Sequence, residues 1–301
     1  MKTTILRALT ILVPSAYVIS NKTVLTLHNF RFPSIFLSWQ LSIALLVIIL
    51  VYRQYVMTLT LSDLQSYVMG SLFLTFSLYF GSRALSVLPI PVFISGQILG
   101  THVVKGIGQL RTAKSLSITI IALQSLTSVI MLPLFILLLN KADAYIVLCF
   151  LCHILSTCAM IGLGKTPSDL ESTIKQAVVK IVVAISSLLI YGTLTGELVK
   201  AGKYDFSKTH FKVYLMCSGV LSASTFVVRG WSFRSGKLQF RLVFQYVAVL
   251  ILGYWYDYNG DVTRNRDLLI SFYFLFLLLV DTYLAKTSSV DSTKTVPVDQ
   301  V

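Results

Sequence analysis

Five basic residues interrupt apolar segments in the second half of the chain, and their types and spacing suit phosphate binding. Lys180 lies among valine and isoleucine residues, and four further cations follow at Arg229, Arg234, Lys237 and Arg241. Ammonium and guanidinium groups bind phosphate oxygens, and the planar guanidinium does so with two parallel hydrogen bonds. The sequence therefore predicts an anion site in which Arg229 and Arg241 hold phosphates and Lys180 meets a sugar or a second phosphate.

Two neighbouring residues complete this predicted substrate site. Gln245 and Tyr246 follow Arg241 by about one helical turn and are suited to contact a base or a ribose. Each residue of the site also has a structural interpretation. The Lys180 stem can extend to the membrane interface, and the cations from 229 to 241 can make a cytosolic loop positive for topology. Glutamine and tyrosine also bond and pack between helices.

Several kinds of chemistry are missing from the sequence. The acids Asp143, Glu197, Asp267 and Asp281 fall near the ends of apolar segments, and only His153 lies well inside one. Proton-driven carriers usually need a buried titratable group, whereas exchange of one anion for another does not. Phosphate loops, paired carboxylates and metal motifs are not found, so we expect neither an enzyme nor a cofactor or metal.

The composition indicates a membrane protein. Of 301 residues, 55% are apolar and 12% are charged, about half the charged fraction of a soluble domain. Backbone groups in lipid must bond internally, and these long apolar runs lack strand alternation, so helices are predicted. The net charge of +13 comes from basic residues scattered singly between apolar runs. This pattern suits loops that face anionic headgroups and does not suit nucleic-acid binding.

We predict an all-α fold of about ten transmembrane helices in two inverted five-helix halves. Residues 1–286 form one transporter domain, with halves of about 1–140 and 141–286, and residues 287–301 form a disordered cytosolic tail. The distribution of Lys and Arg favours cytosolic termini. The predicted spans are roughly 5–25, 32–52, 64–85, 88–107, 115–138, 143–163, 173–196, 210–230, 239–257 and 267–285.

Small residues follow the start of the fourth predicted span. They are Gly96, Gly100, Gly106 and Gly108. Small side chains let helix backbones approach closely, so these positions suit packing within the fold or a homodimer. The sequence leaves both open.

Five segments carry a resemblance to a known family: Ser20–Leu25, Phe32-Pro33, Trp39-Gln40, Gly81–Phe93 and, later, Ser224–Arg229. They touch most of the chain, with the firmest part at residues 20–93, and are similar to nucleotide-sugar transporters of the drug/metabolite transporter superfamily. The stretch from Gly81 to Phe93 is especially similar to a Golgi branch considered UDP-N-acetylglucosamine carriers and related to GDP-mannose transporters. The resemblance implies an antiporter that exchanges a nucleotide sugar for a nucleoside monophosphate by alternating access, in a Golgi or endoplasmic-reticulum membrane.

Two motifs of GDP-mannose transporters have no counterpart here. Their Phe-Tyr-Asn-Asn motif would fall where Val182–Ser187 reads Val-Val-Ala-Ile-Ser-Ser, and their Gly-Ala-Leu-Asn-Lys motif would fall near Phe240–Phe244. The resemblance thus implies a fold and a substrate class and leaves the sugar and base open. Two other functions fit the sequence: a carrier of another organic phosphate or metabolite, and a non-transporting membrane scaffold.

Overall fold

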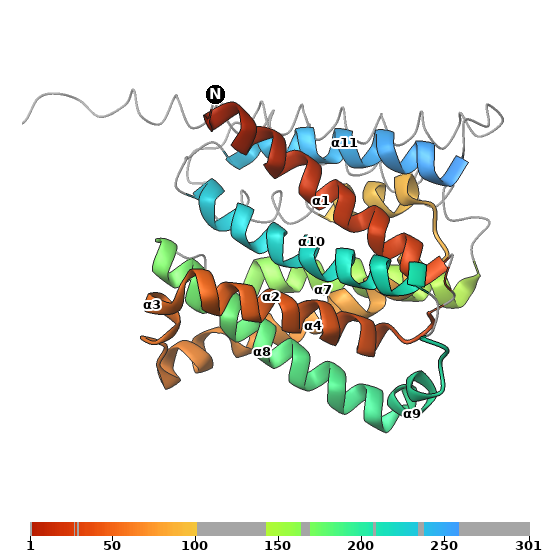
Figure 1. The fold of residues 1–301 in the computed structure, drawn as a ribbon, viewed down its shortest axis with the longest axis horizontal. Helices are drawn as coiled ribbons and strands as arrows, with labels where there is room; N and C mark the ends of the chain where they lie inside the picture. The colour runs from red at the N-terminus through yellow and green to blue at the C-terminus, as the bar shows by residue number, and fades with distance from the viewer. Residues whose placement is uncertain are drawn as a thin grey trace, which may run out of the picture.

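The computed structural model describes residues 2–26, 28, 30–100, 143–163, 169–206, 209–233 and 238–258, and describes only the backbone at 2–8, 10, 161–163, 227–233, 238–244 and 258. All regular secondary structure in these ranges is helical, as predicted (Figure 1). The helices are α1 (Lys2–Thr26), α2 (Pro33–Val51), α3 (Arg53–Val56), α4 (Leu61–Leu85), an unlabelled helix Ile90–Gly100, α7 (Ala144–Leu163), α8 (Leu170–Leu194), α9 (Glu197–Gly202), α10 (Thr209–Phe233) and α11 (Leu238–Tyr258).

The bounds of the long helices agree with the predicted spans to within a few residues. Pro33 opens α2, because a proline at the first helical position gives up only an amide that would lack a helical partner anyway. Capping boxes open two other helices, with Thr60 and Asp63 at α4 and Asp169 and Ser172 at α8. The predicted spans 115–138 and 267–285 and the predicted tail lie outside the described residues.

Three described helices, α2, α4 and α8, are long and apolar enough to cross a membrane. The outward face of α8 is as apolar as its inward face. Leu189 and Ile190 are 42% and 62% exposed, whereas Leu188 is buried. A helix that is apolar all round needs lipid or protein on every side. The structure therefore supports three of the predicted spans by length and composition, and the number of ten stays a prediction.

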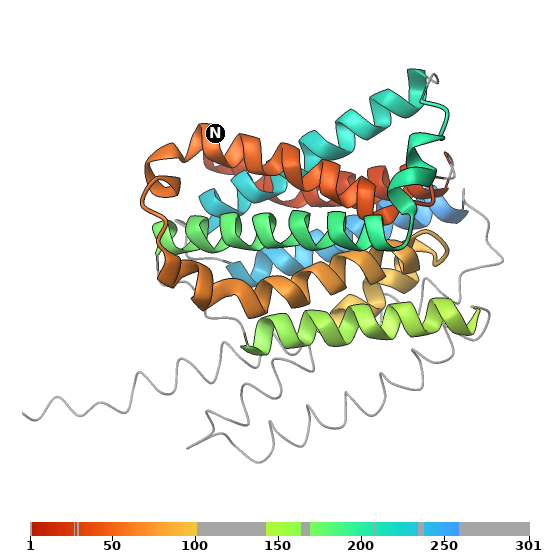
Figure 2. The same cartoon turned by 90° about the horizontal axis from the view of Figure 1, so that it is seen from below.

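The long helices lie side by side in a bundle. Helix α8 runs between α2 and α4, and α4 also packs against α7 (Figure 2). On the other side of the bundle, α1 packs against α10 and α11, and α10 packs against α2. Helices α4 and α8 run in the same direction, because residues at the starts of both helices meet and residues at their ends meet.

Glycines permit the closest approach between helix 90–100 and α7. A Cβ atom on Gly96 would lie 2.3 Å from the Phe150 ring, and one on Gly100 would lie 3.1 Å from Ile154. Any larger side chain would push these helices apart. Gly96 and Gly100 thus serve packing within the chain, while Gly106 and Gly108 lie outside the described residues.

The two short helices lie at opposite ends of the bundle (Figure 1), which we call the α3 end and the α9 end. Gly196 separates α8 from α9 with φ at 71°, a left-handed conformation that side chains with a Cβ disfavour. At the α9 end, aromatic rings join the α1–α2 connection to the start of α10. Phe30 and Phe211 are fully buried there, and Tyr204 donates a hydrogen bond to the His28 carbonyl.

Candidate functional site

A buried carboxylate organises the α9 end. Glu197, the first residue of α9, is 5% exposed. Its Oε1 accepts a hydrogen bond of 2.7 Å from Arg83 Nη2, and its Oε2 accepts from the backbone N and the Oγ of Ser34. A buried charge is tolerated only where a counter-charge and hydrogen bonds replace its lost water. Glu197 therefore ties α9 to the start of α2 and the end of α4.

Tyr79 supports the same ion pair from one turn earlier on α4. Its hydroxyl donates to Glu197 Oε1 at 3.3 Å and accepts from Arg83 Nε and Nη2 at 3.3 and 3.2 Å. The Arg83 carbon Cζ also lies 5.6 Å from the centre of the Tyr79 ring. The guanidinium is thus held in one orientation by a carboxylate and a phenol, which fixes where its remaining donors point.

A pocket of about 430 Å³ lies beside this network. The ends of α1 and α4, the start of α7 and the α1–α2 connection form it. Among the described residues of its lining, Arg31 and Arg83 are cations and none is a carboxylate. The described lining is Leu25, Thr26, Phe30, Arg31, Pro33, Ser82, Arg83, Ser86, Val87, Tyr145 and Ile146.

A second buried cation joins α1 to α11. Lys22 is 5% exposed, donates to the Leu88 carbonyl and lies 3.8 Å from Asp257 Oδ1. The other oxygen of Asp257 accepts from the backbone N of Ile90, at the start of helix 90–100. Lys22 thus holds three helices together, and its charge has a counter-charge beside it.

Lys180, from the predicted site, lines a separate cavity of about 260 Å³. Five helices contribute to it: α2, α4, α7, α8 and α10. Among the described residues that line the cavity, Lys180 alone is charged, with Thr173 and Gln176 as polar neighbours. The lining is Ile48, Tyr52, Leu74, Met160, Thr173, Ile174, Gln176, Ala177, Lys180 and Phe226.

The other predicted site residues are placed less completely. Arg229 lies on α10 and Arg241 on α11, but their side chains are outside the described part of the chain. Gln245 and Tyr246 lie on α11, partly buried, and Tyr246 packs against the core shared by α7, α11 and helix 90–100. Neither is among the residues that line the Lys180 cavity.

Sequence reasoning did not find two ion pairs that the structure contains. Arg83 and Lys22 each have a carboxylate partner, Glu197 and Asp257. Arg83 binds Glu197 and also lines a pocket. Arg83 and Glu197 are 114 residues apart along the chain, so no local sequence motif could reveal that they form a pair. The one local signal in the sequence is Gly196, which marks the turn between α8 and α9 just before Glu197.

His153 joins helices, as expected for a lone histidine in an apolar segment. Its Nδ1 lies 2.8 Å from the Ser77 carbonyl, and its ring stacks on Phe93 at 5.1 Å. A Cβ atom on Gly81 would lie 2.7 Å from Nδ1. The ring thus fits against α4 only where glycine stands.

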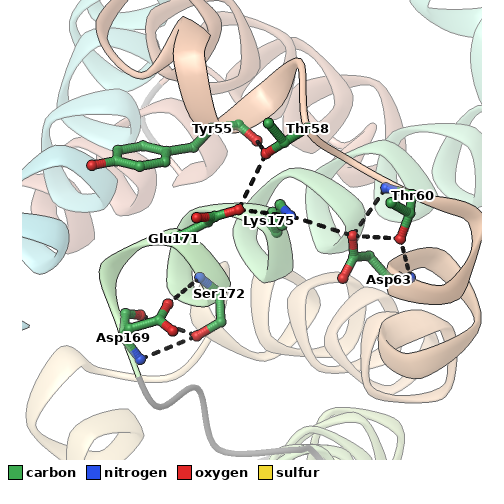
Figure 3. A network of polar contacts seen from close by, with 8 residues as sticks. All are labelled: Tyr55, Thr58, Thr60, Asp63, Asp169, Glu171, Ser172 and Lys175. Atoms are coloured by element: carbon green, nitrogen blue, oxygen red, sulfur yellow. Dashed lines mark hydrogen bonds and ion pairs between the residues drawn. The ribbon is translucent and has the colours of Figure 1, made fainter.

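The opposite, α3 end holds an exposed polar cluster (Figure 3). Lys175 on α8 lies 2.8 Å from Glu171 and 3.7 Å from Asp63, and Thr58 donates to Glu171. Asp63 and Glu171 are 24% and 46% exposed at their side chains. Water reaches this cluster, so its contacts link α4 to α8 only weakly.

Comparison with protein-family models finds none that matches the chain, and comparison with curated proteins finds no significant match. The class that the described residues define is therefore an α-helical bundle with three helices able to cross a membrane.

Proposed function

We propose that the protein is a nucleotide-sugar transporter of the UDP-N-acetylglucosamine or GDP-mannose type. It would exchange a nucleotide sugar for a nucleoside monophosphate across a Golgi or endoplasmic-reticulum membrane by alternating access. The observation that carries the proposal is the Lys180 cavity, a hollow between helices of both predicted halves with a single charged lining residue among those described. An ammonium group that lines a hollow between helices can bind the phosphate oxygens of an anionic ligand there.

The helix packing supports two halves of inverted topology. If the second half repeats the first five helices, α1 corresponds to α7, α2 to α8, α4 to α10, and helix 90–100 to α11. The contact of α1 with α10 then corresponds to that of α7 with α4, and the contact of α2 with α10 to that of α8 with α4. Both members of each pair are present. Helix 90–100 packs on α7 as α11 packs on α1.

This symmetry supports a mechanism in which the halves rock about a shared site. Repeats of five helices have opposite orientations in a membrane, so the same packing closes one side in one state and the other side in the next. Helices α2 and α8 correspond to each other and touch directly at the centre of the bundle. Lys180, on α8, faces a cavity beside that contact.

The segments that resemble nucleotide-sugar transporters also contact one another. Asn21 accepts a hydrogen bond of 2.6 Å from Gln40, and Lys22 donates to Leu88. Thr23 bonds Tyr256 at 3.1 Å. Segment Ser20–Leu25 therefore contacts two other segments that carry the resemblance, Trp39-Gln40 and Gly81–Phe93, which fits a shared structural requirement.

Exchange by reconstituted protein tests the proposal. Liposomes loaded with nucleoside monophosphate should take up one radiolabelled nucleotide sugar from a panel, and Lys180→Ala should lower the rate by about tenfold, as expected for loss of a charge-assisted contact. Lys212→Ala, which removes an exposed cation of α10, is the matched control and should keep the rate. Exchange of no panel member, with the protein folded, contradicts the proposal.

Competition assays separate the other two functions. Inhibition by simple organic phosphates but by no nucleotide sugar would indicate another carrier of the superfamily. Binding of neither would indicate a membrane scaffold.

A further inference from the structure

The pocket at the α9 end has the features of an anion site distinct from the Lys180 cavity. In the part of its lining that the structure describes, Arg31 and Arg83 are the cations and no Asp or Glu is present. We propose that this pocket binds the phosphate group of a small phosphate ester or of a lipid headgroup, with Arg31 and Arg83 as its ligands. The pocket's volume of about 430 Å³ lies within the range of small-molecule sites.

The ion pair behind the pocket prepares Arg83 for this role. The Glu197 side chain is 7% exposed, whereas that of Arg83 is 28% exposed. The carboxylate is therefore sealed behind the guanidinium, which keeps part of its surface open to the pocket. Tyr79 and Glu197 engage Nε and Nη2. Guanidinium carries five N–H donors, so the group retains donors beyond those that these contacts use.

Two hydroxyls of the pocket already have acceptors. The Thr26 hydroxyl donates to the Lys22 carbonyl, and the Ser86 hydroxyl donates to the Arg83 carbonyl. The guanidinium groups are the charged donors of the described lining. A pocket whose charged donors are guanidinium groups suits an oxyanion, and phosphate matches the fork of an arginine best.

The pocket is well separated from Lys180. Arg83 lies in the last turn of α4 and contacts Glu197, which comes shortly after the end of α8. Lys180 lies on α8 itself, about 20 Å of helix before that end. The two sites are therefore independent, and the phosphate site does not require the carrier proposal to hold. In a carrier, it would lie where substrate enters or leaves.

Binding to purified full-length protein in a phosphate-free maltoside detergent tests the inference. The probes are radiolabelled inorganic phosphate and glycerol 3-phosphate in one arm, and a short-chain phosphatidylglycerol in the other. Arg31→Ala and Arg83→Lys should each weaken binding of the preferred probe by about tenfold. Arg83→Lys keeps a charge beside Glu197, so it tests the fork geometry without leaving the carboxylate unpaired.

The control is Arg53→Ala, which removes an exposed cation at the α3 end. It should keep phosphate binding at this pocket. If binding of the small phosphates depends on Arg31 and Arg83, the ligand is a soluble phosphate. If only binding of the lipid depends on them, the ligand is a lipid headgroup. Equal affinities of wild type, Arg31→Ala and Arg83→Lys for every probe, or no binding at all, overturn the inference. Nucleotide-sugar exchange by Lys180→Ala tests the carrier proposal and does not bear on phosphate binding at this pocket.

Discussion

Helices α4 and α8 are joined by charges at both ends, and the two ends differ in their access to water. At the α9 end, Glu197 is 5% exposed and has Arg83, Tyr79 and Ser34 as partners. At the α3 end, Lys175 meets carboxylates that are 24% and 46% exposed (Figure 3). At the α9 end, removing one charge would leave the other buried without a counter-charge, which is strongly destabilising. At the α3 end, water can replace each contact that is lost.

The largest effect is expected from breaking the buried pair. Arg83→Ala leaves Glu197 without its counter-charge and should lower the free energy of unfolding by about 3–5 kcal/mol. Thermal unfolding in detergent measures the change. A melting temperature equal to that of wild type would show that water reaches Glu197, and thus that the charges at the α9 end are as accessible to water as those at the α3 end.

Removing both charges should recover much of that loss. Arg83→Met combined with Glu197→Met replaces the pair by apolar side chains, and buried pairs replaced in this way are often close to neutral in stability. The double variant should therefore melt well above Arg83→Ala. If the double variant melts below Arg83→Ala, the ion pair stabilises the fold more than apolar side chains in the same place do.

A smaller effect is expected at the turn that places Glu197. Gly196→Ala puts a Cβ on a residue with φ at 71° and should cost about 1–2 kcal/mol. Gly202→Ala is the matched control, because a Cβ there meets nothing within 4 Å and its φ is not positive. Equal melting temperatures for the two variants would show that Gly196 does not constrain the turn.

The smallest effect is expected at the α3 end. Lys175→Ala removes the centre of an exposed cluster, so we expect a small fall in melting temperature that disappears in molar salt, where exposed charges are screened. A fall as large as that of Arg83→Ala, or one that persists in molar salt, would place this cluster among the buried networks.

Much of the fold could be predicted from the sequence because its long apolar runs have marked ends and are as long as the helices that they form. Pro33 marks the start of α2, and the apolar runs give the bounds of α7, α8, α10 and α11 to within a few residues. The helices α3 and α9 were not predicted. They have 4 and 6 residues, too few to show a helical period.

The candidate sites were harder to predict because they depend on contacts across the chain. Lys180 was identified as a charge inside an apolar segment, and it does line a cavity. The roles of Arg83 and Lys22 depend on Glu197 and Asp257, which are far away in sequence. No spacing rule relates such partners, so only the packing of α1, α4, α9 and α11 brings them together.

The most direct test of the carrier proposal is ligand-induced stabilisation of purified protein. A carrier must bind its cargo, and a ligand at 100 times its dissociation constant adds about 2.7 kcal/mol to the free energy of unfolding. We expect one nucleotide sugar from a panel to raise the melting temperature of wild type and of Lys212→Ala equally, and to raise that of Lys180→Ala only about half as much, as a tenfold weaker affinity requires. No rise with any nucleotide sugar at millimolar concentration would contradict the proposed function.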